Sequence, residues 1–231
     1  MWPFKPKLPI IQEDKEWIEV NLLWLKEQFG HHVDPITPTP DHFPMEFMGS
    51  KADAHRILSI VCGRMGTPTD NIELRFFDPL PMMEDFMLAP EETDTPEGIY
   101  HRSEDGKHII ELNRQQLPDF DTLVATIAHE AAHIKLLTLG DPEEDEEYLT
   151  DLTAIYFGFG IFIGNSAFKF SQWQDGSHQG WSSKRSGYLP EQVIAYAMAT
   201  LYPEDDWITY LTNLMGKYVK QSHRFISTTH G

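Results

Sequence analysis

The sequence predicts an α+β fold, with two N-terminal helices, a small antiparallel sheet and further helices up to the C-terminus. Apolar residues recur at helical spacing before residue 66 and after residue 118, whereas the residues between these regions alternate apolar and polar side chains. An Asp-Gly step at Asp105 indicates a hairpin between two of the strands. Helices and strands that are segregated along the chain are typical of α+β domains.

Residues 1–50 are predicted to form an N-terminal helix and a proline-rich arm. Apolar residues recur every three or four positions in residues 12–29, with charged residues between them. Residues 31–50 contain four prolines and few apolar repeats, which is typical of a surface arm. We expect a main domain of residues 51–231 to follow, and its first element is a second helix at residues 51–65.

Three strands are expected after the second helix. Residues 71–77 alternate apolar and polar side chains. Residues 99–102 and 107–113 flank the turn Ser103-Glu104-Asp105-Gly106, so these two runs should pair as an antiparallel hairpin. Residues 78–98, which are rich in proline and acidic side chains, are predicted to be a long loop between the first strand and the hairpin.

Two helices joined by a short turn are predicted next. Residues 122–137 carry a wide apolar face, and Gly140 is suited to end this helix. The segment Asp141-Pro142-Glu143-Glu144 is a compact helix start, with an N-cap residue, proline at the first helical position and an acidic first turn. Because the connection is so short, the two helices should run antiparallel.

The rest of the chain is expected to be helical with one interruption. The helical pattern continues through Phe157-Gly158-Phe159-Gly160, where the glycines indicate close core packing. Residues 164–188 break the pattern and are rich in Gly, Ser and Trp, as in a long connection. Helices are predicted at residues 189–201 and 207–219, and the second of them closes the domain.

Composition excludes several classes of partner. The 231 residues include 18 Lys and Arg against 36 Asp and Glu, a formal net charge of −18. Nucleic acids and anionic membrane surfaces require clustered basic side chains, so neither is expected as a partner. The single cysteine, Cys62, cannot form an internal disulfide and is expected to be a small buried hydrophobic residue. With no signal-peptide pattern at the N-terminus, the sequence predicts a cytoplasmic protein.

One sequence motif has the residue types and spacing of a metal-binding site. Residues 129–133 read His129-Glu130-Ala131-Ala132-His133, an HExxH pattern within the predicted helix 122–137. Histidines at positions i and i+4 share one face of a helix and can reach the same metal ion, while the glutamate is close enough to act on a water molecule bound to that ion.

The predicted helix hairpin brings acidic side chains to the same place. His133 lies seven residues before Gly140 and Glu147 lies seven after it, so both should be about 10 Å from the turn at a rise of about 1.5 Å per residue. His129 and Asp151 are each eleven residues from Gly140. Asp151 should therefore lie level with His129, where it can accept the free ring N–H of that histidine and fix its orientation.

These positions predict a site for one Zn²⁺ ion per chain. His129, His133 and Glu147 would be the three protein ligands, and the fourth position would be left to water, as in catalytic zinc sites. Glu130 would take a proton from that water and pass it to the leaving amine. Glu144 is an alternative third ligand, because Glu147 belongs to a run of acidic residues that could simply be solvated.

The motif resembles the gluzincin metallopeptidases, in which HExxH is followed by a helix carrying Glu-x-x-x-Asp, here Glu147-Tyr148-Leu149-Thr150-Asp151. The short spacing is similar to that of compact minigluzincin domains, and the resemblance covers residues 107–163, about a quarter of the chain. It implies a zincin-like fold for residues 51–231, with the sheet packed on the active-site helix hairpin. It also implies that strand 107–113 is the edge strand that pairs with extended peptide substrates.

The resemblance further implies a downstream residue that stabilises the oxyanion of the tetrahedral intermediate. Four side chains are candidates, and Tyr188 is favoured because it ends the long connection before a helix; the others are His178, Arg185 and His223. The sequence thus predicts a zinc metallopeptidase acting on peptides or one protein substrate. The alternatives are a zinc-binding regulatory or interaction module with little or no peptidase activity, and a helical interaction domain in which HExxH is accidental.

Overall fold

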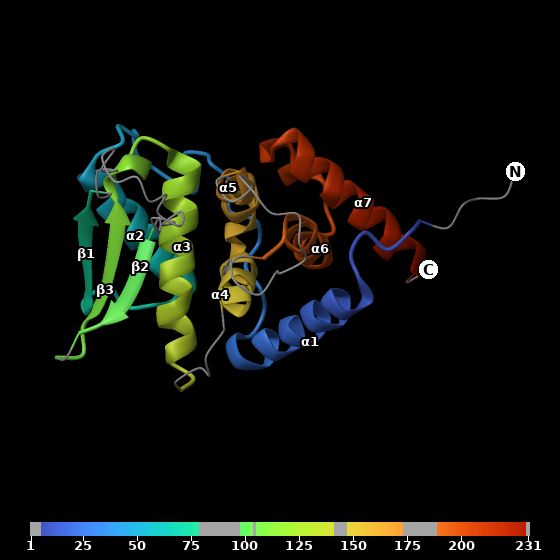
Figure 1. Ribbon diagram of the computed structural model, residues 1–231, viewed down its shortest axis with the longest axis horizontal. Coiled ribbons are helices and arrows are strands. Elements are labelled where there is room, and N and C mark those ends of the chain that lie inside the picture. The colour runs from blue at the N-terminus through green and yellow to red at the C-terminus, as the bar shows by residue number, and fades with distance from the viewer. Residues whose placement is uncertain (1–5, 79–97, 104, 141–146, 173–188, 230–231) are drawn as a thin grey trace, which may run out of the picture.

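The computed structural model describes residues 6–78, 98–103, 105–140, 147–172 and 189–229 (Figure 1). Within these residues the α-helices are α1 (Gln12–Phe29), α2 (Lys51–Met65), α3 (Phe120–Leu137), α4 (Glu147–Ala154), α5 (Gly160–Gln172), α6 (Glu191–Leu201) and α7 (Asn213–Thr229). The strands are β1 (Ile72–Phe77), β2 (Gly98–Arg102) and β3 (His108–Asn113). Shorter helical turns are η1 (Arg114–Gln116), η2 (Ile155–Phe159) and η3 (Asp206–Tyr210).

The predicted α+β class is confirmed, but the sheet is mixed rather than antiparallel. Its strand order is β1-β3-β2. β2 pairs antiparallel with β3, as the Asp-Gly turn predicted, whereas β1 pairs parallel with β3. A hairpin turn determines only the pairing of the two strands that it joins, and β1 is not joined to β3 by one. β3 is therefore the central strand, so the expectation that residues 107–113 form the edge is wrong; β2 is the edge next to α3 (Figure 1).

The two N-terminal helices have the predicted bounds because strong local signals end them. α1 is followed by Gly30 at φ 83°. α2 begins with a capping box, in which Ser50 and Asp53 exchange hydrogen bonds, and ends at Gly66 in the left-handed conformation. α1 packs against α4 and α6, so the N-terminal helix lies directly on helices from the second half of the chain.

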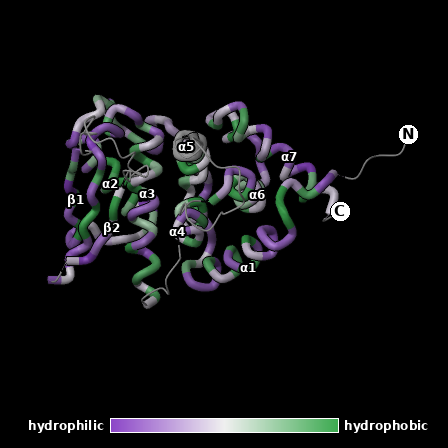
Figure 2. The backbone as a smooth tube through the Cα atoms, in the orientation of Figure 1, coloured by the Kyte–Doolittle hydropathy of each residue, from purple (hydrophilic) through white to green (hydrophobic). Residues whose placement is uncertain are grey.

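α3 lies between the sheet and helices α4, α5 and α6, and it is buried along almost its whole length (Figure 1). The side chain of Asp119 caps its N-terminus by accepting a hydrogen bond from the backbone N–H of Thr122 at 3.3 Å. Figure 2 shows hydrophilic positions along β1 and much of α1, whereas hydrophobic positions gather where the central helices meet.

The helical run after α4 is broken at Gly158, where a continuous helix was expected. Gly158 has φ 96°, and its carbonyl accepts a hydrogen bond from Ile36 N–H at 2.9 Å. The carbonyl of Tyr156 likewise accepts from Val33 N–H at 3.0 Å. The expected close packing is present, because a Cβ atom at Gly158 would lie only 2.6 Å from the carbonyl oxygen of Asp34. The proline-rich arm thus inserts its backbone at the break.

Two boundaries near the C-terminus also differ from expectation. α5 continues to Gln172, into the segment predicted to be an irregular connection. In place of one helix at residues 207–219, the chain forms η3 and then α7. The side chain of Asn165 in α5 explains the separation, because its Oδ1 accepts from Thr212 N–H and its amide donates to the carbonyl of Tyr210. No helix among the described residues is both long enough and apolar enough to cross a bilayer.

Candidate metal centre

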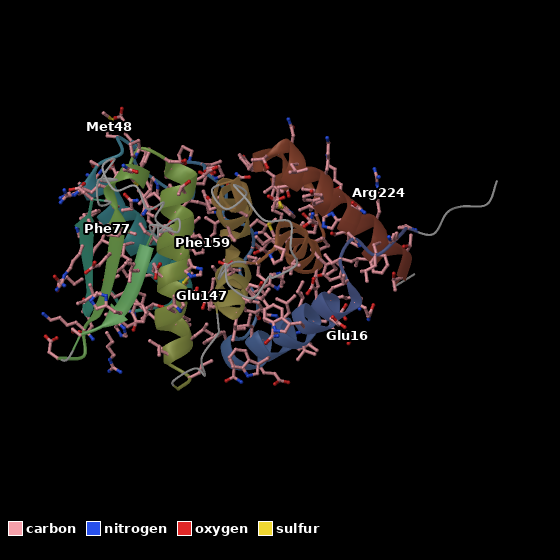
Figure 3. All side chains as sticks on the ribbon, viewed as in Figure 1. Glu16, Met48, Phe77, Glu147, Phe159 and Arg224 are labelled. Atoms are coloured by element: carbon pink, nitrogen blue, oxygen red, sulfur yellow. The ribbon has the colours of Figure 1, made fainter. Side chains whose placement is uncertain are left out.

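Three side chains from α3 and α4 bring donor atoms together. His129 Nε2 lies 2.8 Å from Glu147 Oε2, and His133 Nε2 lies 3.5 Å from the same oxygen. One donor atom from each of the three residues lies within 4.8 Å of the other two. Ligand atoms around a tetrahedral zinc ion with bonds of about 2.0–2.1 Å are roughly 3.3 Å apart. The group is therefore close enough to hold a metal ion, and Figure 3 shows Glu147 between the two helices.

The residue spacing predicted this arrangement in part: Asp151 lies beside His129 as expected, but Glu147, which was expected level with His133, makes its shorter contact with His129. His129 and His133 lie one turn apart on α3, and Glu147 is the first residue of α4. Glu147 contacts both imidazoles, and Asp151, one turn further along α4, contacts His129. The predicted start of the second helix at Asp141 and the alternative ligand Glu144 lie outside the described residues.

His129 is held in a buried hydrogen-bond chain. Its Nδ1 lies 2.8 Å from Asp151 Oδ1, and the other oxygen of Asp151 accepts from Leu189 N–H at 2.9 Å. A carboxylate can only accept, so Nδ1 donates and Nε2 is directed at Glu147. Burial lowers the pKa of His129, but the hydrogen bonds to Asp151 and Glu147 outweigh burial and raise the pKa well above its ordinary value. The surroundings thus favour positive charge at this point.

Glu147 is partly exposed, with 46 % of its side chain accessible. Burial raises its pKa, but hydrogen bonds with His129 and His133 outweigh that effect, so the pKa lies below the ordinary value for glutamate. The side chain is therefore a carboxylate at neutral pH, which is the form that binds metal ions.

Two contacts to His133 were not found from the sequence. Its Nδ1 lies 3.3 Å from the hydroxyl of Thr150, which is buried in α4. The ring of Tyr100, in β2, lies nearly parallel to the His133 ring, with centroids 5.9 Å apart and an angle of 12° between the planes. Thr150 could have been found from its place three residues after Glu147, on the same face of the helix. No local signal joins Tyr100 to His133, because the two residues are on different elements.

Glu130 is a residue of α3 whose carboxylate lies next to the start of β2, and it is only 5 % exposed. Burial raises its pKa, while the neighbouring imidazoles of His129 and His133 act in the opposite direction. Gly98 lies directly against it, because a Cβ atom there would be 2.7 Å from Glu130 Oε1 and 2.5 Å from Thr126 Cγ2. The edge strand can approach this close only because residue 98 has no side chain.

A small hollow with a volume of about 20 Å³, little more than the space of a water molecule, lies beside His129 and Glu130. Helices α3, α4, α5 and α6 all contribute to its walls, and most of the lining outside the metal group is small or aliphatic. The lining residues are Ala125, Thr126, His129, Glu130, Asp151, Ile163, Ala167 and Ile194.

The expected oxyanion-stabilising residues are not part of the described site. Tyr188, the favoured candidate, lies outside the described residues, as do His178 and Arg185. His223 is in α7, where its ring nitrogens contact Asp205 Oδ1 at 2.7 Å and the carbonyl of Tyr202 at 2.9 Å. Both ring nitrogens of His223 are thus engaged where α6 and α7 meet, away from the three donor residues.

Cys62 is a buried core residue of α2, as expected. Burial raises the pKa of its thiol to about 12, so it is not a thiolate at neutral pH. No protein-family model matches the chain, and neither a curated protein nor a solved structure matches it. The functional interpretation therefore depends on the sequence pattern and on the geometry of the donor group.

Proposed function

We propose that this protein is a zinc-dependent metallopeptidase. The observation that carries the proposal is the convergence of His129 Nε2, His133 Nε2 and a carboxylate oxygen of Glu147 beside a second, buried carboxylate, Glu130. The first three are donors suited to a metal ion, and the fourth is in the position of a general base within HExxH. A peptide or protein is the proposed substrate.

The donor set fits zinc. Two imidazoles and one carboxylate on facing helices leave the fourth tetrahedral position open, as in catalytic rather than structural zinc sites. A site for a softer metal such as Cu(I) would include a thiolate ligand. The chain's cysteine, Cys62, is a core residue of α2 and is not part of the donor group. When bound, zinc would polarise the carbonyl of the scissile bond and lower the pKa of water.

The side chains around the site would then divide the remaining work. Glu130 would accept a proton from the attacking water and deliver it to the leaving amine, and its burial raises its pKa towards the range useful for a general base. Asp151 would hold the Nδ1–H of His129 so that Nε2 faces the ion.

The experiment is a measurement of zinc per chain by elemental mass spectrometry on protein purified without a histidine tag, together with Glu147→Ala and Glu130→Gln. About one zinc in the wild type, a clear loss in Glu147→Ala, and retained zinc with abolished peptide hydrolysis in Glu130→Gln are expected. Full hydrolysis by Glu130→Gln would remove that residue as the base.

The same experiment separates the alternative functions. Zinc binding with no hydrolysis of any peptide in a library would favour the regulatory or interaction module. If the wild type bound no zinc after dialysis against it, both zinc-dependent functions would be refuted, and the helix hairpin would have only a structural role.

A further inference from the structure

We infer that Tyr100, held in place by His108, is a positioning residue for the metal ligand His133. The inference concerns how the sheet orients a side chain of the metal site. It rests on the proposed zinc site and is independent of whether the protein cleaves peptides.

The edge strand presents alternate residues to α3. In a strand, residues two apart point to the same side and are about 6.6–6.8 Å apart. Gly98 lies against Glu130, and two residues further along β2 Tyr100 stacks on His133. Ile99, between them, points away from α3 and is 39 % exposed. The strand therefore follows α3 over the turn that carries the second half of HExxH.

The two histidines are held very differently. The side chain of His129 is 6 % exposed and donates to a buried carboxylate at 2.8 Å. The side chain of His133 is 23 % exposed, and its Nδ1 has a neutral hydroxyl, that of Thr150, at the longer distance of 3.3 Å. Hydrogen bonds to charged partners are roughly twice as strong as neutral ones. The orientation of His133 thus depends more on other contacts, and the nearly parallel Tyr100 ring restricts how far its imidazole can tilt.

Tyr100 is itself fixed by the centre of the sheet. Its hydroxyl lies 2.8 Å from His108 Nδ1, and the two rings are stacked with centroids 5.8 Å apart. His108 begins β3, which is paired on both sides. Burial lowers the pKa of His108, with Arg102 acting in the same direction, so the neutral ring can accept from the tyrosine hydroxyl through Nδ1. The order His108, Tyr100, His133 thus links the central strand to the metal site.

The experiment measures zinc affinity by competition with a chromogenic chelator, using the full-length chain. Tyr100→Leu removes the ring and the hydroxyl and should weaken zinc binding by roughly tenfold or more, as expected when the support of a ligating histidine is lost. Tyr100→Phe removes only the hydrogen bond and should have a smaller effect. His108→Leu removes both the hydrogen bond and the ring that stacks on Tyr100, so its effect should be at least as large as that of Tyr100→Phe. His108→Asn retains an acceptor near the position of Nδ1 and should bind zinc more tightly than His108→Leu. His101→Leu, on the opposite face of β2, is the matched control and should bind zinc normally.

A second readout separates positioning from general stability. Replacing Zn²⁺ by Co²⁺ gives visible absorption bands that report the geometry of the ligands. These bands should change in Tyr100→Leu and stay the same in His101→Leu. Melting temperatures of the metal-free variants identify any that merely fold less well. Zinc affinity within twofold of wild type and an unchanged Co²⁺ spectrum in Tyr100→Leu would overturn the inference alone. Absence of zinc from the wild type would overturn the proposed function together with this inference.

Discussion

Replacement of Asp151 by alanine tests the metal site without any knowledge of the substrate. Asp151 is 1 % exposed and bridges two groups, the Nδ1–H of His129 at 2.8 Å and the backbone N–H of Leu189 at 2.9 Å. Asp151→Ala removes both acceptors at once. It leaves the three proposed ligands, His129, His133 and Glu147, unchanged.

Two effects of different size should follow. Loss of the carboxylate that orients a ligating histidine weakens metal binding by about 10–100-fold, which corresponds to about 1.4–2.8 kcal/mol of binding free energy. Each buried donor left without a partner costs about 1–3 kcal/mol of folding free energy. The metal-free variant should therefore also melt at a lower temperature than the metal-free wild type.

The assay is chelator competition for zinc affinity, with thermal unfolding of the metal-free protein measured in parallel. The chain offers a matched control in the pair of Asp205 and His223, whose atoms are 2.7 Å apart and whose carboxylate side chain is exposed. Asp205→Ala should leave the zinc affinity unchanged and lower the folding free energy by less than about 1 kcal/mol, as is usual for exposed pairs. An unchanged zinc dissociation constant in Asp151→Ala would refute the proposed role of this residue.

Four further measurements address other parts of the structure. Gly98→Ala should displace Glu130 by about 1 Å, because a Cβ there would lie 2.7 Å from its carboxylate, and hydrolysis should fall by roughly 100-fold with zinc retained. Gly63→Ala, where a Cβ meets nothing within 4 Å, is its control, and equal activity of the two variants would contradict the argument. Gly158→Ala should lower the melting temperature sharply, because the Cβ would lie 2.6 Å from a backbone oxygen; an unchanged melting temperature would show that the break needs no glycine. The thiol of Cys62, with its pKa raised to about 12 by burial, should react with a thiol reagent only after unfolding, and fast labelling of the native protein would place it at the surface. Zinc at 100 times its dissociation constant should stabilise the protein by about 2.7 kcal/mol, so removing zinc with a chelator should lower the melting temperature. An unchanged melting temperature would contradict the presence of a zinc site.

The spacing of the helix hairpin predicted the position of Asp151, which lies beside His129 as expected. The resemblance to gluzincins implied that strand 107–113 is the edge, whereas β3 is central and β2 packs next to α3. That error arose because the edge of a sheet depends on which distant segment pairs on each side, and sequence periodicity contains no information about this. β1, with its parallel pairing, occupies one of those sides.

The sequence by itself determined the features that depend on neighbours along the chain. The bounds of α1 and α2 follow from periodicity and capping residues, and the group of His129, His133 and Glu147 follows from helical spacing on both sides of a short turn. Only the tertiary structure decided the mixed sheet, the break at Gly158 and the contact of Tyr100 with His133. Each of these depends on segments that are far apart in sequence, whose pairing is set by packing of the whole chain rather than by local backbone preference.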